Sequence, residues 1–513
     1  MLIQARKFEE WIMIKRCIIL FLLTLYALYQ DGFTQVSVEI GRIKFEGNYI
    51  LKDDDLLKLS GIKEGNPFNL RYIEDGIENI IKWYDNNGYP YCRIKLNKVE
   101  SGKMTDTKSI PVSLEFNVDE GRIVAIDTII VKGNKLSSRK LIIRESGIKK
   151  GEIFSQKKID EAKVYLSRLP YVKGVSKLEL ISFGRNKNGV VIDISENPSS
   201  RFQGIFGYLP SPGKGKGCFV GSFNINLSNV FGGGRSFSAY WEKKDRNSQD
   251  LSLTYSEPWV MDLPLNVSFT VNQIIQDSTF VQRFYSATIG YKINNIFSSY
   301  FTIKSEGTFP EDYGKEKFGL YKMQSRFISA GLNYDTRNNV NNPVKGIRYS
   351  SSYSIGKRNN IENKKNKPFT DRKVDILMEL IIPLNNYNVF FLKGYAKKLR
   401  SSEKKIPYSQ LLSLGGAKSL RGYKERQFRS SFIGLMTLEY RYIISEYSRF
   451  FLFFDIGFFQ DENSPDKRLI RRAGYGWGMR INTRLGMIGF DYGLGRDDSF
   501  MKGKIHFTLE NKF

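Results

Sequence analysis

The chain has 513 residues, with 79 Lys and Arg against 53 Asp and Glu, and therefore carries a formal net charge of +26. One histidine, His506, and three cysteines are too few for a His-based catalytic triad, a multi-His metal site or a Cys-rich metal cluster. The basic residues are scattered and lack the spacing of nucleic-acid-binding motifs, so contact with anionic lipid head groups is expected instead.

Residues 1–33 are predicted to be an export signal. Lys15 and Arg16 precede an apolar run at 17–29, as a charged n-region precedes an h-region, and a start at Met13 would place these charges correctly. The run is shorter than the roughly 20 residues that a membrane-spanning helix needs. A short anchor or a buried helix is the alternative interpretation.

Residues 34–121 and 122–198 are predicted to be two copies of one module. At an offset of 86 residues, the Gly-Asn pair at 47–48 matches the pair at 133–134, and SGIK at 60–63 matches SGIK at 146–149. Each copy has the pattern of one strand, two helices and two strands, because alternating segments flank apolar residues at helical spacing. The expected strands lie at 40–46, 91–99 and 112–119 in the first copy, and at 126–131, 174–182 and 190–196 in the second.

This order of elements, with the Gly-Asn turn and the segment NNGYPY after the long helix, resembles the POTRA domain of bacterial outer-membrane assembly factors. Neither copy contains paired acids or a phosphate-binding glycine loop. The sheet edges of such a module could accept an extended client strand by β-augmentation. The sequence leaves open whether the modules bind clients or act as rigid spacers.

Residues 199–513 are predicted to form a transmembrane β-barrel of sixteen strands, so the fold class is α+β modules followed by an all-β barrel. Apolar and polar residues alternate along most segments, as lipid-facing and lumen-facing positions do in outer-membrane barrels. A soluble sandwich also alternates, but it needs fewer outward aromatic residues. Strands are expected near residues 201, 218, 235, 250, 265, 283, 298, 321, 347, 372, 388, 430, 449, 472, 487 and 502, with short turns after the even-numbered ones.

The longest predicted loop, at 399–430, contains LGGAKSLRGY at 414–423. This segment resembles the [VI]RG[FY] element of the POTRA-containing barrel superfamily that includes BamA, TamA and the two-partner secretion transporters. The elements YDTRNNVNNPVKG at 334–346, FFDIG at 453–457 and GWGMRINTRLGMIGFDYGLG at 476–495 continue the resemblance in order.

The resemblance implies that Leu420, Arg421, Gly422 and Tyr423 anchor the loop inside the barrel. Asp455, on the inward face of its predicted strand with Gly457, is the expected partner of Arg421, and Asp491 is the second candidate. A bidentate arginine–carboxylate pair would supply a charge-assisted anchor. Gly422 would permit a close turn, and Tyr423 would pack against the barrel wall. Alternatively, Arg421 is a solvated loop charge.

The seam between the first and last barrel strands is a second candidate site. Gly204 and Gly207 weaken the first strand, and the resemblance implies that such a seam opens sideways to template an incoming strand. Phe513 is expected to act as the terminal signal for the insertion of this protein itself. Simple barrel curvature is the alternative explanation of the two glycines.

We therefore expect a non-enzymatic outer-membrane protein of a Gram-negative-type bacterium, with its modules in the periplasm and no cofactor. The resemblance implies that it captures client strands and inserts outer-membrane proteins through the seam. Its expected partners are unfolded outer-membrane proteins, periplasmic chaperones or accessory lipoproteins, and outer-membrane lipids, with no nucleic acid. Export of a partner polypeptide through the barrel is the alternative function, and a passive pore is a further one.

Overall fold

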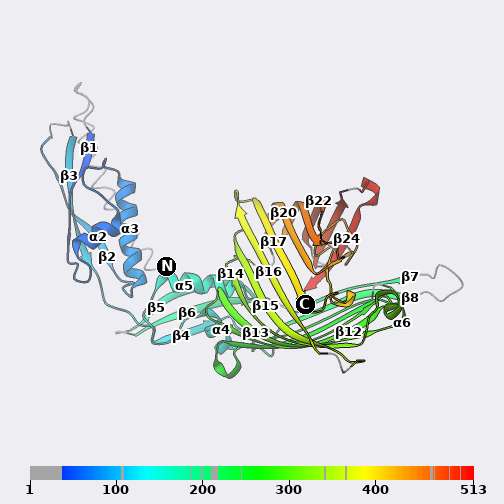
Figure 1. Ribbon diagram of the computed structural model, residues 1–513. Helices are drawn as coiled ribbons and strands as arrows, with labels where there is room; N and C mark the ends of the chain where they lie inside the picture. The colour runs from blue at the N-terminus through cyan, green and yellow to red at the C-terminus, as the bar shows by residue number, and fades with distance from the viewer. Residues whose placement is uncertain are drawn as a thin grey trace. The chain divides into compact units, whose positions relative to one another are not determined.

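The computed structural model describes two α+β modules and an antiparallel barrel (Figure 1). The described residues are 37–104, 109–184, 187–197, 200–209, 218–243, 245–339, 342–363, 367–462, 466, 468–483, 486–496 and 498–512. The predicted export signal and Phe513 lie outside them. None of the described helices is long and apolar enough to cross a membrane.

The first module contains β1 (Ser37–Glu46), α2 (Asp53–Ser60), α3 (Leu70–Asn86), β2 (Arg93–Ser101) and β3 (Ser109–Asp119). β3 lies between β1, to which it is parallel, and β2, to which it is antiparallel. The helical spacing of α3 buries Ile73, Ile80 and Tyr84 against this sheet. The Tyr84 hydroxyl donates to Glu120 Oε1 at 2.7 Å, so the polar end of this buried ring has a partner.

The second module contains β4 (Thr128–Lys132), α4 (Arg139–Ser146), α5 (Gln156–Ser167), β5 (Val172–Phe183) and β6 (Lys187–Glu196). Its sheet order, β4-β6-β5, is equivalent to that of the first module. The order of one strand, two helices and two strands predicted from the sequence is confirmed in both copies.

The Gly-Asn turn has the same geometry in both modules. Gly47 and Gly133 have φ angles of 83° and 77°, which glycine adopts most readily. The Asn48 side chain donates to the carbonyl of Leu51 at 2.8 Å, and the Asn134 side chain donates to the carbonyl of Ser137 at 3.0 Å. The sequence repeat is therefore a repeat of structure down to this side-chain hydrogen bond.

Within the described residues, the barrel has sixteen strands in chain order, each antiparallel to its neighbours, and β24 closes it onto β7. The strands are β7 (Arg201–Leu209), β8 (Cys218–Val230), β9 (Arg235–Lys243), β10 (Gln249–Glu257), β11 (Leu265–Gln276), β12 (Phe280–Lys292), β13 (Phe297–Pro310), β14 (Met323–Asp335), β15 (Gly346–Asn360), β16 (Phe369–Pro383), β17 (Asn388–Ser401), β20 (Phe432–Ser445), β21 (Ser448–Gln460), β22 (Leu469–Thr483), β23 (Gly486–Gly495) and β24 (Lys504–Lys512). The predicted barrel and its strand number are confirmed.

β21 illustrates the alternation that the sequence predicts. Phe450, Leu452 and Phe454 are 38–51% exposed on the outer face, whereas Phe451 and Phe453 are at most 4% exposed on the inner face. Because side chains alternate across a strand, this polarity pattern produces a lipid-facing outer wall and a packed inner wall.

Short elements within two of the barrel loops were not predicted. The loop after β13 contains α6 (Asp312–Phe318), and the loop after β17 contains the 3-10 helix η2 (Tyr408–Gln410) and a short hairpin of β18 (Leu412–Leu414) and β19 (Phe428–Ser430). They are too short to produce a clear hydrophobic period in the sequence.

Candidate functional site

The long loop, residues 402–431, joins β17 to β20 and folds against the inner wall of the barrel. Its β18–β19 hairpin pairs Leu412 with Ser430 and Leu414 with Phe428. Residues 415–427 connect the two short strands and carry the predicted motif. Leu420, Arg421 and Gly422 of this connection are buried, so the motif is not a solvated surface turn.

Arg421 donates to two carboxylates on adjacent strands. Its Nε and Nη2 lie 2.7 and 2.8 Å from Asp455 Oδ2 and Oδ1 of β21, which makes the bidentate pair that the sequence predicts. Its Nη1 lies 2.8 Å from Oε1 of Glu439 on β20. The backbone N–H of Arg421 also donates to Asp455 Oδ2, at 3.2 Å. Both the side chain and the backbone of this residue are therefore fixed to the wall.

Glu439 was not identified from the sequence. The register pairs Glu439 with Phe453, one inward position away from Asp455. The Arg421 guanidinium, which contacts both carboxylates, also stacks on the Phe453 ring, with its Cζ 3.6 Å from the ring centroid. Glu439 also accepts from Arg441 at 2.7 and 2.9 Å, so two arginines face two carboxylates here.

The Arg421 cluster is excluded from solvent. Arg421, Glu439 and Arg441 are 5–7% exposed, and Asp455 has no exposed surface. Buried ion pairs gain little over apolar packing, but removing one partner leaves an uncompensated charge and costs about 3–5 kcal/mol. The cluster therefore strongly favours the inward position of the loop over a released one.

Leu420 packs beside the ion pair in an apolar cluster with Leu414, Ile433, Leu435 and Phe459. Gly457 makes room for it, since a Cβ added to this glycine would lie 2.7 Å from Leu420 Cδ2. The predicted residue Gly457 therefore lies next to the motif, and its lack of a side chain lets Leu420 pack there. The cluster buries apolar surface of the loop against β20 and β21, which adds to the charged anchor.

Gly422 and Tyr423 bring the loop against β22 and β23. Gly422 has φ of 87°, and an added Cβ would lie 2.4 Å from the carbonyl carbon of Leu494, so both the conformation and the contact require glycine. The Tyr423 hydroxyl donates to the carbonyl of Ala473 on β22 at 2.9 Å.

Asp491, the second candidate for the partner of Arg421, has a different partner in the structure. Asp491 accepts instead from Nη1 and Nη2 of Arg480, both at 2.7 Å. The register explains the difference, because Asp491 lies opposite Gly478, and Arg480 is the next inward residue of β22. The glycine leaves space for the arginine to reach diagonally to the carboxylate.

A second buried cluster, around Arg358 of β15, was also missed. Its Nε lies 2.8 Å from Asp371 Oδ2 on β16, and its Nη1 lies 2.7 Å from Glu403 Oε2 at the start of the long loop. Nη1 also donates to the Tyr321 hydroxyl at 2.6 Å. Arg358 has no exposed surface, and Asp371 is 1% exposed. The base of the long loop is thus joined to two neighbouring loops.

The family element at 334–346 forms a third arginine cluster, at the opposite end of the strands. Arg337 donates from Nη2 to Asp335 at 2.7 Å and from Nη1 to Glu379 of β16 at 3.3 Å. It is 8% exposed. The turn between β14 and β15 is therefore tied to the wall, which a sequence motif alone does not show.

The predicted seam glycines lie beyond the pairing that closes the barrel. β24 pairs with β7 at Asn511–Phe202 and Lys512–Arg201. Gly204 and Gly207 pair with Phe223 and Val220 of β8 on their other side.

Within the part of the chain that the structure describes, no group of three or more His, Cys, Asp or Glu could hold a metal ion. The buried charges described above are arginine–carboxylate clusters. Their role is structural, because they hold loops against the barrel wall. A sixteen-stranded barrel with an inward, arginine-clamped loop, preceded in the chain by two α+β modules, defines the class of POTRA-containing outer-membrane barrels.

Comparison with known families gives the same class. The Omp85 superfamily domain matches residues 229–513, and the POTRA model, described as a surface antigen variable number repeat, matches residues 38–121 and 124–197. The chain belongs to the Omp85 superfamily. The predicted family and the location, an outer-membrane barrel with periplasmic POTRA modules, are confirmed.

Curated relatives carry assembly-factor names. A putative outer membrane protein assembly factor of Treponema pallidum is 27% identical over 256 residues, which are 47% of this chain and 28% of that protein. Outer membrane protein assembly factor BamA of Nitratidesulfovibrio vulgaris is 21% identical over 523 residues, covering 93% of this chain and 62% of that protein. The chain thus spans less than two thirds of the length of these relatives.

Solved structures show the same fold. BamA from Haemophilus ducreyi lacking POTRA domains 1–3 has a TM-score of 0.52 at 19% identity and covers 93% of this chain and 100% of its own. CdiB from Escherichia coli has a TM-score of 0.56 at 14% identity and covers 94% of this chain and 92% of its own.

Proposed function

We propose that this protein helps to fold and insert other outer-membrane proteins, by non-covalent templating of client strands. The relatives' names support this assignment. The structural observation that carries it is the short seam: within the described residues, β24 pairs with β7 at two positions, whereas β7 pairs with β8 at nine. Unpaired backbone at a strand edge is a template for another strand.

The Arg421 cluster has a defined part in this mechanism. It fixes the long loop to β20 and β21, and Gly422 and Tyr423 extend the contact to β22 and β23. The loop thereby braces the strands that precede β24. A braced wall allows the seam to separate while the rest of the barrel keeps its register.

The modules supply a second kind of edge. The outer edge of β1 is bonded to residues 66–68, through Ile40 N–H to Asn66 and Phe68 N–H to Val38. In the second module, residues 152–154 are bonded in the same way to Val124 and Ile126. β2 and β5 are therefore the remaining edge strands of their sheets. We propose that these edges hold extended client segments before insertion.

Reconstitution tests the proposed function directly. The full chain is placed in phospholipid vesicles, and a small unfolded outer-membrane barrel protein is added as the client probe. Folding is followed by the heat-dependent mobility of the client on gels. We expect faster folding than in empty vesicles. Equal rates in the two preparations would contradict an insertion function.

Export of a partner polypeptide is the second candidate function. The likeness to CdiB shows only a shared fold. The POTRA model matches two segments of this chain, and the family resemblance implies that two such modules suit a two-partner transporter. Depletion of the protein distinguishes the functions. Loss of many barrel proteins from the outer membrane supports insertion, whereas loss of one polypeptide from the medium, with the membrane proteins unchanged, supports export.

A further inference from the structure

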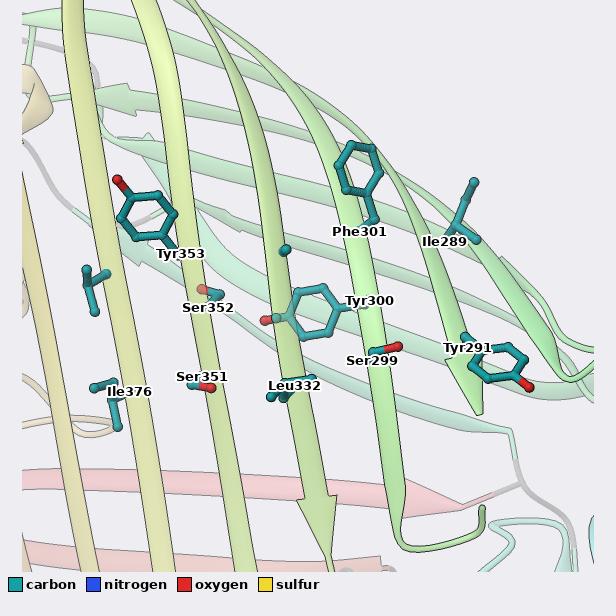
Figure 2. Close-up of a pocket in the computed structure, with 13 residues that line it drawn as sticks. Ile289, Tyr291, Ser299, Tyr300, Phe301, Leu332, Ser351, Ser352, Tyr353 and Ile376 are labelled. Carbon is teal, nitrogen blue, oxygen red and sulfur yellow. The ribbon is translucent and has the colours of Figure 1, made fainter. Parts of the chain in front are cut away.

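The outer wall of the barrel contains an apolar recess of about 660 Å³ over β12–β16 (Figure 2). This volume lies within the range of roughly 300–1,000 Å³ that is typical of small-molecule sites. None of the thirteen lining residues carries a charge. The surface of a barrel normally presents a continuous band of large apolar side chains to lipid, so a hollow in it requires an explanation.

The strand register explains how the hollow arises. One outward row across β13, β14 and β15 contains Phe301, Ala330 and Tyr353, which are directly paired. The next outward row contains Ser299, Leu332 and Ser351 on the same strands. Large and small side chains are therefore staggered, with the smallest at the centre of one row and at both sides of the next.

Phe301 and Tyr353 are 43% and 50% exposed, and Leu332 is 42% exposed, so these residues form raised borders around Ala330. The bottom of the recess is formed by residues that face the inside of the barrel. Gly331 has no side chain, and a Cβ added there would lie 2.3 Å from Cζ of Tyr300. Figure 2 shows the Tyr300 side chain reaching toward the neighbouring strand.

The recess lies near the periplasmic end of the strands. One outward position closer to that end, Phe297 pairs with Tyr334, and Tyr334 pairs with Tyr349. Tyr334 and Tyr349 are 37% and 36% exposed. Such aromatic rows mark the level of the lipid head groups in membrane barrels. The recess is therefore within the hydrocarbon region of the periplasm-facing leaflet.

We propose that this recess holds an acyl chain of a phospholipid from that leaflet, with the head group at the tyrosine row. Each of β13, β14 and β15 is paired on both sides, so no backbone edge is available there for a protein strand. The lining also lacks the charges that would orient a protein partner. A flexible apolar chain in contact with the membrane fits both features.

Photolabelling tests the proposal on the full chain. The protein is reconstituted in phosphatidylethanolamine vesicles that contain a small fraction of a phospholipid with a photoreactive acyl chain. We expect the label to concentrate in peptides of β13–β15. An even distribution around the barrel would overturn the proposal, because it would indicate only general lipid contact.

Filling the recess gives the second arm. Ala330→Leu should reduce this labelling about tenfold, the change expected when roughly two methylenes lose their contact, and Ser351→Leu should act similarly. Ala287→Leu is the matched control, since Ala287 is on the outer face of β12 and does not line the recess. Unchanged labelling in both filled variants, with heat-dependent gel mobility showing a folded barrel, would contradict the proposal.

A third arm separates lipid from protein occupants. A photoreactive amino acid in place of Leu332 should form adducts with phospholipid in native membranes. Adducts with a protein at that position would overturn the lipid assignment, whichever protein is captured.

Discussion

At the scale of single residues, Arg421 joins the long loop to the wall through one guanidinium. Arg421→Ala would leave Asp455 buried without its bidentate partner, at a cost of about 3–5 kcal/mol. We expect the loop to leave its inward position and client folding in vesicles to slow, while the barrel stays inserted. Lys424→Ala, an exposed residue of the same loop, is the control. Wild-type activity of Arg421→Ala would contradict the anchoring role.

Arg421→Lys provides a finer test of the same contact. Lysine keeps the charge but cannot make the planar, bidentate contact with Asp455 or stack equally well on Phe453. We expect client folding between that of the wild type and that of Arg421→Ala. Full activity would show that charge alone is sufficient.

Gly422→Ala tests the close approach of the loop. The φ of 87° is strained for alanine, and the new Cβ would meet the Leu494 carbonyl at 2.4 Å. We expect increased protease cleavage within residues 415–427 and slower client folding. Gly394→Ala on β17 is the matched control, because no atom lies within 4 Å of its added Cβ. Equal behaviour of the two variants would indicate that the turn tolerates movement.

Glu196 makes the stability of the second module depend on pH. Burial alone would raise the pKa of this carboxyl, but hydrogen bonds from the Ser137 hydroxyl and from backbone N–H groups of residues 135–137 lower it below its ordinary 4.5. A lowered folded pKa means that the stabilisation is present above about pH 4.5 and is lost as the pH falls through the folded value.

Hydrogen exchange of the full chain at residues 135–137 measures this effect. Exchange should accelerate as the pH falls below about 4.5, after correction for the intrinsic rate, and Glu196→Gln should remove the dependence. A dependence that persists unchanged in Glu196→Gln would assign the titration to another group.

At the scale of elements, the loops are held by buried arginines from different strands. Arg358 of β15 joins the β15–β16 hairpin to Glu403 of the long loop. Arg358→Ala should therefore increase protease access at residues 402–408 in intact membranes, by leaving Asp371 and Glu403 without their partner. Lys357→Ala, on the opposite face of the same strand, should have no effect. Protection equal to wild type in Arg358→Ala would rule out this second anchor.

The elements themselves were largely predictable from the sequence. Period-two alternation identified the barrel strands, and the 86-residue repeat identified the modules, because both patterns follow directly from backbone geometry. Glu439 and the Arg480–Asp491 pair were not predictable, since they depend on the register between strands. A shift of two residues in β22 against β23 would change the partner of Asp491 without altering any pattern in the sequence.

At the scale of the whole molecule, the charge of +26 is compatible with a membrane protein because the polar half of each barrel strand faces inward. Some of the arginines that contribute to this charge form the buried clusters that hold loops against the barrel wall. The proposed mechanism combines these fixed loops with one short seam, so that a single pair of strands can separate. The apolar recess at β12–β16 would bind lipid on a wall whose strands remain paired.

Crosslinking of the seam tests the central claim most directly. Phe202→Cys with Asn511→Cys would join β7 to β24 at a paired position, and Gln203→Cys with Asn224→Cys would join β7 to β8 as the control. Both are made in a Cys218→Ser background and assayed for client folding in vesicles, before and after reduction. We predict that the seam crosslink blocks folding reversibly and that the control crosslink does not. Full activity with the seam closed would contradict insertion through it.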